Sequence, residues 1–181
     1  MKLTSSNFGA ALGLNPWMSR QKLFRVMTGK ESRDPLNDKM AWGLDHEHDA
    51  VAAVEAHTGL MFDYTGKHQQ HIENFGYGTT PDGSCGYIGL EVKCPSKLYD
   101  DVPAHYMVQV QGQAWLAGFE QVYFGAWTPE ETRIWRVDSG GEYVRWMAPL
   151  LTEFMTYVQD DVEPKRKKKV IPPEVITERI L

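Results

Sequence analysis

The chain has 181 residues, of which 42% are hydrophobic and 12% aromatic, so it is long and apolar enough to form one globular domain. Its formal net charge is −5 at pH 7, with basic residues predominating in residues 1–33 and 165–181 and acidic residues predominating between them. No apolar run approaches the roughly 18 residues of a membrane span, and the start of the chain lacks the apolar core of a signal peptide.

The sequence contains 2 cysteines, Cys85 and Cys94, and no Cys-x-x-Cys pair. This pattern argues against a zinc ribbon, an iron–sulfur cluster and a disulfide scaffold. It favours a protein of a reducing cytosol, and the lack of long apolar runs predicts that no segment enters a membrane.

The start of the chain predicts two short helices. They cover residues 5–11 and 19–27, because a serine stands at the beginning of each and a glycine follows each. The second helix carries the cations Arg20, Lys22 and Arg25. Residues 30–37 are predicted to form a loop.

The next predicted helix, residues 38–57, has a carboxylate in its apolar stripe. Met40, Leu44, Val51 and Val54 follow helical spacing with one gap, and Glu47 fills that gap. A carboxylate that faces the core needs a cation, a metal ion or several donors to offset its burial. Glu47 is therefore a candidate metal ligand, and an internal ion pair with a Lys or Arg is the commoner alternative.

Four strands are predicted after this helix, at residues 60–64, 68–73, 75–80 and 87–94. Asp82 lies in a Pro-Asp-Gly turn before the last of them. Alternation along that last strand places Glu91 and Lys93 on one face and Leu90 and Val92 on the other. A turn aspartate and a half-solvated strand are each ordinary, but together they place two carboxylates and one ammonium near a common point.

The remaining elements are a helix opening at Pro103, strands at residues 121–127 and 132–137, and a helix at residues 142–159. In the first of these helices Tyr106, Gln109 and Gln113 form a stripe beside the apolar one. The glutamines either reach a phosphate or a metal-bound water, or they form a solvated helix flank.

The order of elements predicts an α/β or α+β domain with a mixed central sheet flanked by helices. We expect this single domain to cover residues 1–164 and a basic C-terminal tail to follow in residues 165–181. The tail is either a solvated end, a phosphate tether or a docking segment for a partner.

The candidate site offers oxygen ligands only, which suit Mg²⁺ or Mn²⁺ rather than zinc. Asp82, Glu91 and Glu47 supply carboxylates, and the backbone carbonyl of Val92 can add a ligand. Such a cation lowers the pKa of a bound water and neutralises charge on a scissile phosphate. Lys93 can orient that water or stabilise the transition state. The pattern therefore predicts a phosphodiester hydrolase.

Five segments carry a more specific signal: LTSSNFGAALGLNPW, MAWGLDHEHDA, TTPDG, GLEVKCP and PAHYMVQVQGQAW, which together span most of residues 3–127. In this order they resemble the PD-(D/E)XK nuclease superfamily, and more narrowly the lambda exonuclease or YqaJ-like viral recombinase family. A lone PD…EXK pattern recurs by chance, whereas five segments in the right order are specific. The resemblance implies a restriction-endonuclease-like core.

The resemblance also implies roles for single residues. It places Asp82, Glu91 and Lys93 on the core motif of the family and Glu47 on its helix-borne acidic position. It places Gln109 on the glutamine of the helix that follows the motif strand, with Tyr106 just before it. Hydroxyl residues that surround the DNA-end phosphate in the family correspond to Ser6 and Thr80.

The function implied is a Mg²⁺-dependent exonuclease, with Mn²⁺ as a substitute, that digests linear duplex DNA 5′→3′ and leaves 3′ single strands. The resemblance further implies a homotrimeric ring, a single-strand annealing protein as partner, and a phage or prophage gene expressed in the bacterial cytoplasm. An endonuclease of the same superfamily and a non-catalytic DNA-end-binding protein remain alternatives.

Recognition of the 5′ end is expected to depart from the family pattern. Such proteins usually carry an arginine upstream of the Ser6 position that serves the terminal phosphate, and few residues precede Ser6 here. Arg20, Lys22 or Arg25 would then have to compensate, and we expect only a mild preference for a 5′-phosphate.

Overall fold

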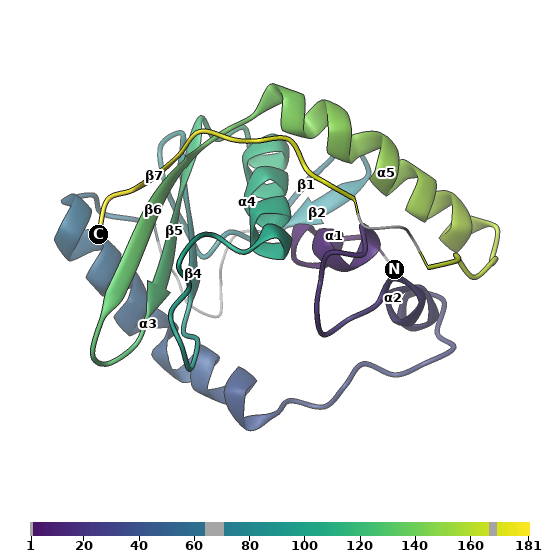
Figure 1. Ribbon diagram of the computed structural model, residues 1–181, viewed down its shortest axis with the longest axis horizontal. Coiled ribbons are helices and arrows are strands. Elements are labelled where there is room, and N and C mark those ends of the chain that lie inside the picture. The colour runs from purple at the N-terminus through teal and green to yellow at the C-terminus, as the bar shows by residue number, and fades with distance from the viewer. Residues whose placement is uncertain (1, 64–70, 167–169) are drawn as a thin grey trace.

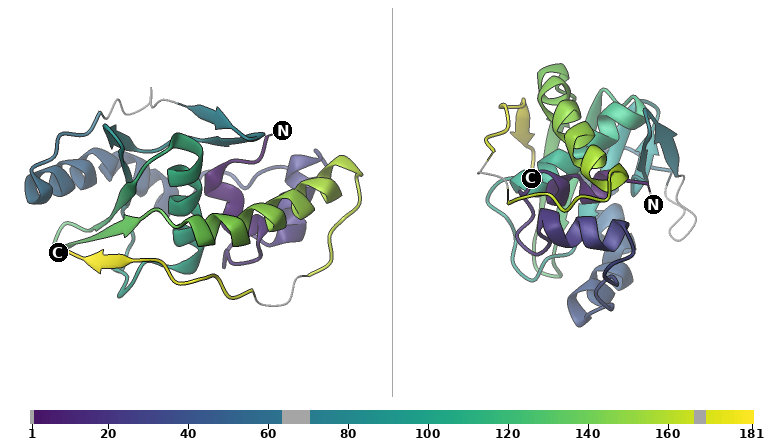
Figure 2. Two further views of the ribbon diagram at one scale, coloured as in Figure 1. Left: turned by 90° about the horizontal axis from the view of Figure 1, so that it is seen from above. Right: turned by 90° about the vertical axis from the view of Figure 1, so that its right-hand side faces the viewer.

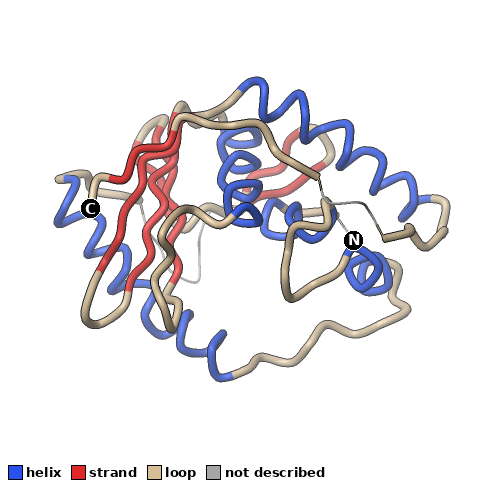
Figure 3. The backbone as a smooth tube through the Cα atoms, viewed as in Figure 1, coloured by secondary structure: helices blue, strands red, loops and turns tan. Residues whose placement is uncertain are grey.

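The computed structural model describes residues 2–63, 71–166 and 170–181 (Figures 1 and 3). The helices of these ranges are α1 (Ser5–Ala11), α2 (Arg20–Met27), α3 (Asp38–Thr58), α4 (Ala104–Ala117) and α5 (Gly141–Gln159). The strands are β1 (Ile72–Asn74), β2 (Tyr77–Thr79), β3 (Gly83–Cys85), β4 (Ile88–Lys93), β5 (Gln121–Trp127), β6 (Thr132–Asp138) and β7 (Thr177–Arg179).

Strands β3 to β7 form one mixed sheet in the order β3-β4-β5-β6-β7, in which β4 and β5 are parallel and the other pairs are antiparallel. Helix α4 connects the two parallel strands, because a parallel pair needs a crossover rather than a tight turn. Strands β1 and β2 form a separate antiparallel hairpin. The predicted mixed central sheet flanked by helices is confirmed.

Different helices cover the two faces of the sheet (Figure 1). Alternation along β4 sends Leu90 and Val92 into an apolar cluster with Val51 and Val54 of α3. The opposite face packs against α4 through Val110, Ala114, Val122, Phe124, Ala126, Trp135 and Val137. Glu91 therefore faces α4, as the alternation predicts.

A second core joins α4 to helices from both ends of the chain. Phe8 of α1, Phe24 of α2 and Phe154 of α5 are buried in one cluster with Val108 of α4. The two helices α1 and α4 approach closely at Gly112, where a Cβ atom would lie 2.7 Å from the Phe8 ring. Figure 2 shows α5 lying along this side of the molecule. Helix α4 therefore packs against the sheet on one side and against α1 and α5 on the other.

Two strand predictions differ from the structure. Residues 60–62 form no strand, and of the described residues 60–63 only Asp63 pairs, as an isolated bridge with Ser84. Residues 64 and 68–70 of the predicted strands lie outside the described residues. Strand β3 is absent from the predictions, because Gly83-Ser84-Cys85 lacks an apolar alternation and gains its strand form from the hairpin with β4.

The first half of α3 is less buried than its pattern predicts. Met40 and Leu44 are 50% and 63% exposed, whereas Val51 and Val54 are in the core. Figure 1 shows the reason, since the start of α3 extends beyond the edge of the packed sheet. The expectation that the whole stripe faces the core is therefore wrong for its first two members.

The end of the basic tail pairs with the sheet. Strand β7 adds to β6 in antiparallel register, and the backbone N–H of Asp138 donates to the carbonyl of Ile176 at 3.0 Å. Of the tail residues that the structure describes, those before β7 lie outside the sheet. Over these same residues, none of the helices is long and apolar enough to cross a membrane.

Candidate active site

The turn that carries Asp82 is fastened to β4 by two hydrogen bonds. The backbone N–H of Asp82 donates to the carbonyl of Leu90 at 3.0 Å, and its Oδ2 accepts from the backbone N–H of Val92 at 2.7 Å. In an extended strand the N–H and C=O of one residue point to the same side, so the Val92 carbonyl also faces the Asp82 side. The turn therefore places a carboxylate and a backbone carbonyl together.

Glu91 is held from α4 by a pair of amides. Gln109 Nε2 donates to Oε1 at 2.6 Å, and Gln113 Nε2 donates to Oε2 at 2.5 Å. Lys93 Nζ also donates to Oε1. Glu91 is 1% exposed, and three donors, one of them charged, offset the cost of burying its carboxyl group.

Gln113 is a functional candidate whose role the sequence leaves undecided. It is fully buried and Gln109 nearly so, so the solvated-flank interpretation of this stripe is wrong. The spacing of four residues between the glutamines is the available signal, because it places both on one face of α4. Their common partner cannot be seen in the sequence.

Lys93 stays protonated although it is partly buried. Burial by itself lowers the pKa of its ammonium, but the charges of Glu91 and Asp82 outweigh burial and raise the pKa above its ordinary value. Its Nζ lies 5.3 Å from the centre of the Tyr106 ring, in cation–π contact. Lys93 is thus a fixed positive charge beside the two carboxylates.

The surroundings of Asp82, unlike those of Lys93, disfavour its charged form. Its burial, followed by repulsion from Glu91 and Glu47, raises the pKa of the Asp82 carboxyl well above its ordinary value, while Lys93 and the Val92 N–H act in the other direction. The site therefore has an excess of negative charge that an added cation would relieve.

Glu47 contributes to this charge from α3. It is half-buried, and its charge raises the pKa of both Asp82 and Cys94. Within the described ranges, however, no three His, Cys, Asp or Glu side chains gather closely enough to hold a metal ion. Glu47 is therefore close enough to act electrostatically on the motif residues without forming a closed carboxylate cage with them.

The residues present fit Mg²⁺, which keeps several of its waters and is commonly bound through one or two carboxylates. Asp82 and Glu91 supply the carboxylates, and the Val92 carbonyl faces the same side as Asp82. A buried amide oxygen at the site, Gln113 Oε1, has no hydrogen-bond partner among the described residues. An acceptor of this kind suits a water of a hydrated cation.

Each of the two predicted hydroxyl residues follows a residue that takes part in a contact between α1 and β2. A buried hydrogen bond of 2.7 Å joins Ser5 Oγ to Thr79 Oγ1 and ties α1 to β2. Ser6 and Thr80, the next residue in each segment, are exposed. Each hydroxyl has a side-chain partner in the structure, Thr4 Oγ1 for Ser6 Oγ at 3.0 Å and His71 Nδ1 for Thr80 Oγ1 at 2.8 Å, so their role at a DNA end stays a prediction.

The two predicted arginines are already engaged elsewhere. Arg20 is 4% exposed, and its Nη2 lies 3.4 Å from Glu153 Oε1 and its guanidinium 5.3 Å from the Tyr157 ring centre. Arg25 pairs with Glu31 and Glu163. A role for either in binding a 5′-phosphate stays a prediction that these contacts do not support.

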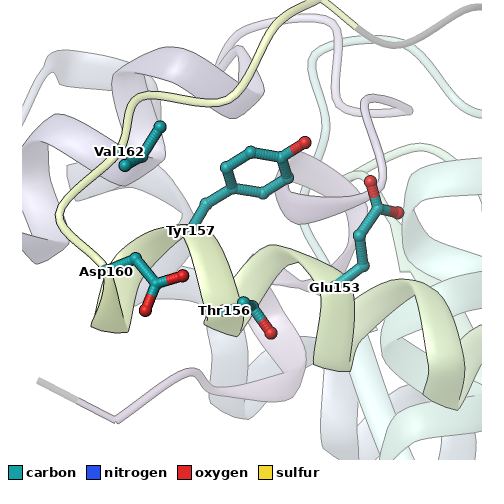
Figure 4. A pocket seen from close by; sticks show the side chains of 5 residues that line it. All are labelled: Glu153, Thr156, Tyr157, Asp160 and Val162. Atoms are coloured by element: carbon teal, nitrogen blue, oxygen red, sulfur yellow. The ribbon is translucent and has the colours of Figure 1, made fainter.

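A pocket of about 360 Å³ lies near Arg20, along the second half of α5 (Figure 4). It is lined by Glu153, Thr156, Tyr157, Asp160 and Val162. It shares no residue with the carboxylate site, and its two acidic side chains do not suit a nucleic-acid phosphate.

The YqaJ-like viral recombinase domain family matches residues 1–120 of the chain. The fold is similar to that of an alkaline exonuclease from Laribacter hongkongensis, with a TM-score of 0.72, 19% identity and 90% of each chain covered. It is also similar to a phage-related exonuclease from Haemophilus somnus, with a TM-score of 0.73, 12% identity, and 88% of this chain and 94% of that chain covered. None of the curated proteins compared matches the chain. Because the family match covers most of the chain and includes the whole carboxylate site, the chain belongs to the YqaJ-like viral recombinase domain family.

Proposed function

We propose that the protein is a Mg²⁺-dependent nuclease that hydrolyses the phosphodiester bonds of linear double-stranded DNA from its ends, in the 5′→3′ direction. The observation that carries this proposal is the cluster of Asp82, Glu91 and Lys93 around one buried point, with Glu91 clamped by two glutamines. The two solved structures with similar folds are described as exonucleases, which agrees with the proposal.

Each residue of the cluster has a distinct part in this proposal. Asp82, Glu91 and the Val92 carbonyl would hold Mg²⁺, and Glu47 would add negative charge from α3. When bound, the cation would supply an activated water and neutralise charge on the scissile phosphate. Lys93, held protonated by the two carboxylates, would stabilise the extra negative charge of the transition state.

The 5′→3′ direction and the binding of a DNA end are finer parts of the proposal. Ser6 and Thr80 are exposed hydroxyls on segments tied together by the Ser5–Thr79 hydrogen bond. They would donate to the phosphate at the DNA end. The test is digestion of linear duplexes labelled at either the 5′ or the 3′ end, with and without Mg²⁺. Loss of the 5′ label first supports the proposal, and loss of the 3′ label first contradicts its direction.

We also propose that the protein assembles as a homotrimer and delivers its single-stranded product to an annealing protein. The start of α3 and the loop before it expose four large apolar residues, Leu36, Met40, Trp42 and Leu44, which are 41% to 63% exposed. An apolar surface of this kind is usually covered by another protein surface. We assign it to a second copy of the chain, since a ring would keep an acidic protein on DNA without charge attraction.

An endonuclease is the second candidate, because the same carboxylate–lysine cluster can cut within a strand. Closed circular DNA separates the two functions, since an exonuclease leaves it intact. Cleavage of circular and linear substrates at equal rates would favour the endonuclease.

A further inference from the structure

Gln113 is buried, and its side-chain amide makes a hydrogen bond to a described residue through the nitrogen but not through the oxygen. Its Nε2 donates to Glu91 Oε2 at 2.5 Å, whereas its Oε1 accepts no hydrogen bond from the described residues. We propose that Gln113 is a positioning residue of the cleavage site. In this role Gln113 would orient Glu91 so that a free lone pair of Oε2 faces the cation. Its own Oε1 would accept a hydrogen bond from a water bound to that cation. This inference rests on the proposed function.

The first step concerns the two oxygens of Glu91. An ionised carboxylate offers about four acceptor positions, two on each oxygen. Lys93 and Gln109 both donate to Oε1 and fill its two positions. Among the residues that the structure describes, Gln113 alone donates to Oε2. The position that remains for a cation is therefore on Oε2, and Gln113 fixes the direction in which it points.

The second step concerns the orientation of the Gln113 amide. Turning the amide over would bring its oxygen against Glu91 Oε2, and two acceptors repel each other. The observed orientation is therefore the one that the carboxylate imposes. It leaves Gln113 Oε1 buried and in need of a donor. A water supplies such a donor, and Mg²⁺ retains waters when two carboxylates bind it.

Gln111 provides a matched control on the same helix. It is as buried as Gln113, with 0% exposure for both side chains. Both halves of its amide are used, since Nε2 donates to the Asp138 carbonyl at 2.8 Å and Oε1 accepts from the Gly140 backbone N–H at 2.8 Å. Gln111 thus ties α4 to the end of β6 and is a purely structural glutamine.

The experiment compares Gln113→Met with Gln111→Met, since methionine keeps most of the volume and removes the amide. Mg²⁺ is titrated against the melting temperature of each purified protein without DNA, and separately against the initial rate of digestion. We expect Gln113→Met to raise the Mg²⁺ midpoint of both curves by about tenfold or more, the usual effect of removing an outer partner of a metal ligand. Gln111→Met should lower the melting temperature but keep the wild-type midpoint.

Gln113→Asn serves as a second variant, because it keeps a polar amide but is too short to reach Glu91. A folded variant of Gln113 with the wild-type Mg²⁺ midpoint would overturn the positioning role. An equal increase in midpoint for Gln111→Met would also overturn it, because the effect would then come from α4 as a whole. Failure of the proposed function looks different, since wild-type protein would then show neither a Mg²⁺-dependent melting shift nor cleavage.

Discussion

Asp82 Oδ2 accepts a hydrogen bond of 2.7 Å from the backbone N–H of Val92, so the turn carboxylate is anchored on the strand that carries Glu91 and Lys93. One N–H does not compensate the burial of Asp82 and its repulsion from Glu91, which together raise the pKa of the Asp82 carboxyl. The anchor therefore holds a carboxylate in a place where its charge is unfavourable without a cation.

Asp82→Asn should stabilise the metal-free protein at neutral pH. A pKa that is raised by folding favours the folded state below the ordinary pKa of the group and disfavours it as the pH rises through the folded pKa. The variant should therefore melt higher than wild type at pH 7, by about 2–4 °C for each kcal/mol relieved. The difference should disappear near pH 4. Melting curves from pH 4 to 8 in EDTA measure this.

The same variant should respond little to Mg²⁺. Wild-type protein should gain melting temperature as the cation binds the native state, by mass action. Asp82→Asn should lose most of this gain, because it removes one of two carboxylates. Equal gains in the two proteins would place the cation elsewhere.

Lys93→Met should impair cleavage more than DNA binding. Removing a preorganised charge that acts on the transition state should lower the digestion rate by about a hundredfold or more. Glu91 would keep its two glutamine donors, so the carboxylate should remain in place. Single-turnover digestion and a band-shift assay with a DNA end measure the two effects. Normal digestion, or loss of binding as large as the loss of rate, contradicts the role given to Lys93.

His105 should make the protein sensitive to mild acid. Burial, with a smaller effect of Lys93, lowers the pKa of His105 from 6.5 to about 4. Between these values the unfolded chain binds a proton that the folded chain does not, so stability should fall as the pH falls through this window. His105→Phe should reduce the loss of melting temperature between pH 7 and pH 5. His48→Phe, at a more exposed position, is the control and should not reduce it.

The trimer proposal predicts about three chains per particle in light scattering. Leu44→Arg should dissociate the particle without unfolding it, because Leu44 is 63% exposed in the single chain. A charge at this position would be buried between copies at high cost. A matched charge at Tyr87, which is 72% exposed and lies in the turn between β3 and β4, should leave the particle intact. Particles of one chain in the wild-type protein contradict the proposal.

If the basic tail binds DNA phosphates, substitutions in it should change how DNA binding depends on salt. Because β7 lies in the same tail, deletion would open the edge of β6, and substitution is the cleaner change. Replacing the basic residues of 165–169 with glutamine should weaken binding and flatten its dependence on salt, by close to one unit of slope for each DNA phosphate that is no longer neutralised. An unchanged slope would leave a docking role or a solvated end.

The sequence predicts which way the side chains of β4 face better than it predicts their partners on other elements. Glu91 and Lys93 are placed correctly because strand alternation and the apolar neighbours Leu90 and Val92 leave only one arrangement. The contact of Gln113 with Glu91 is not predicted, because Glu91 lies on another element. The sequence also does not distinguish a buried glutamine from an exposed one. The exposure of Leu44 is also not predicted, because helical spacing identifies the apolar face of a helix but not where the sheet packed against that face ends.

The carboxylate site has a kinetic consequence, because its residues from Asp82 to Gln113 lie close together in the chain, in the turn before β3 and in the elements β4 and α4 that follow it. Contacts between neighbours in the chain need little loop closure, so we expect them to form by the folding transition state. The packing of α1 against α5 joins distant parts of the chain and should form after it. Substitutions between β4 and α4 should therefore slow folding, whereas substitutions between α1 and α5 should mainly accelerate unfolding.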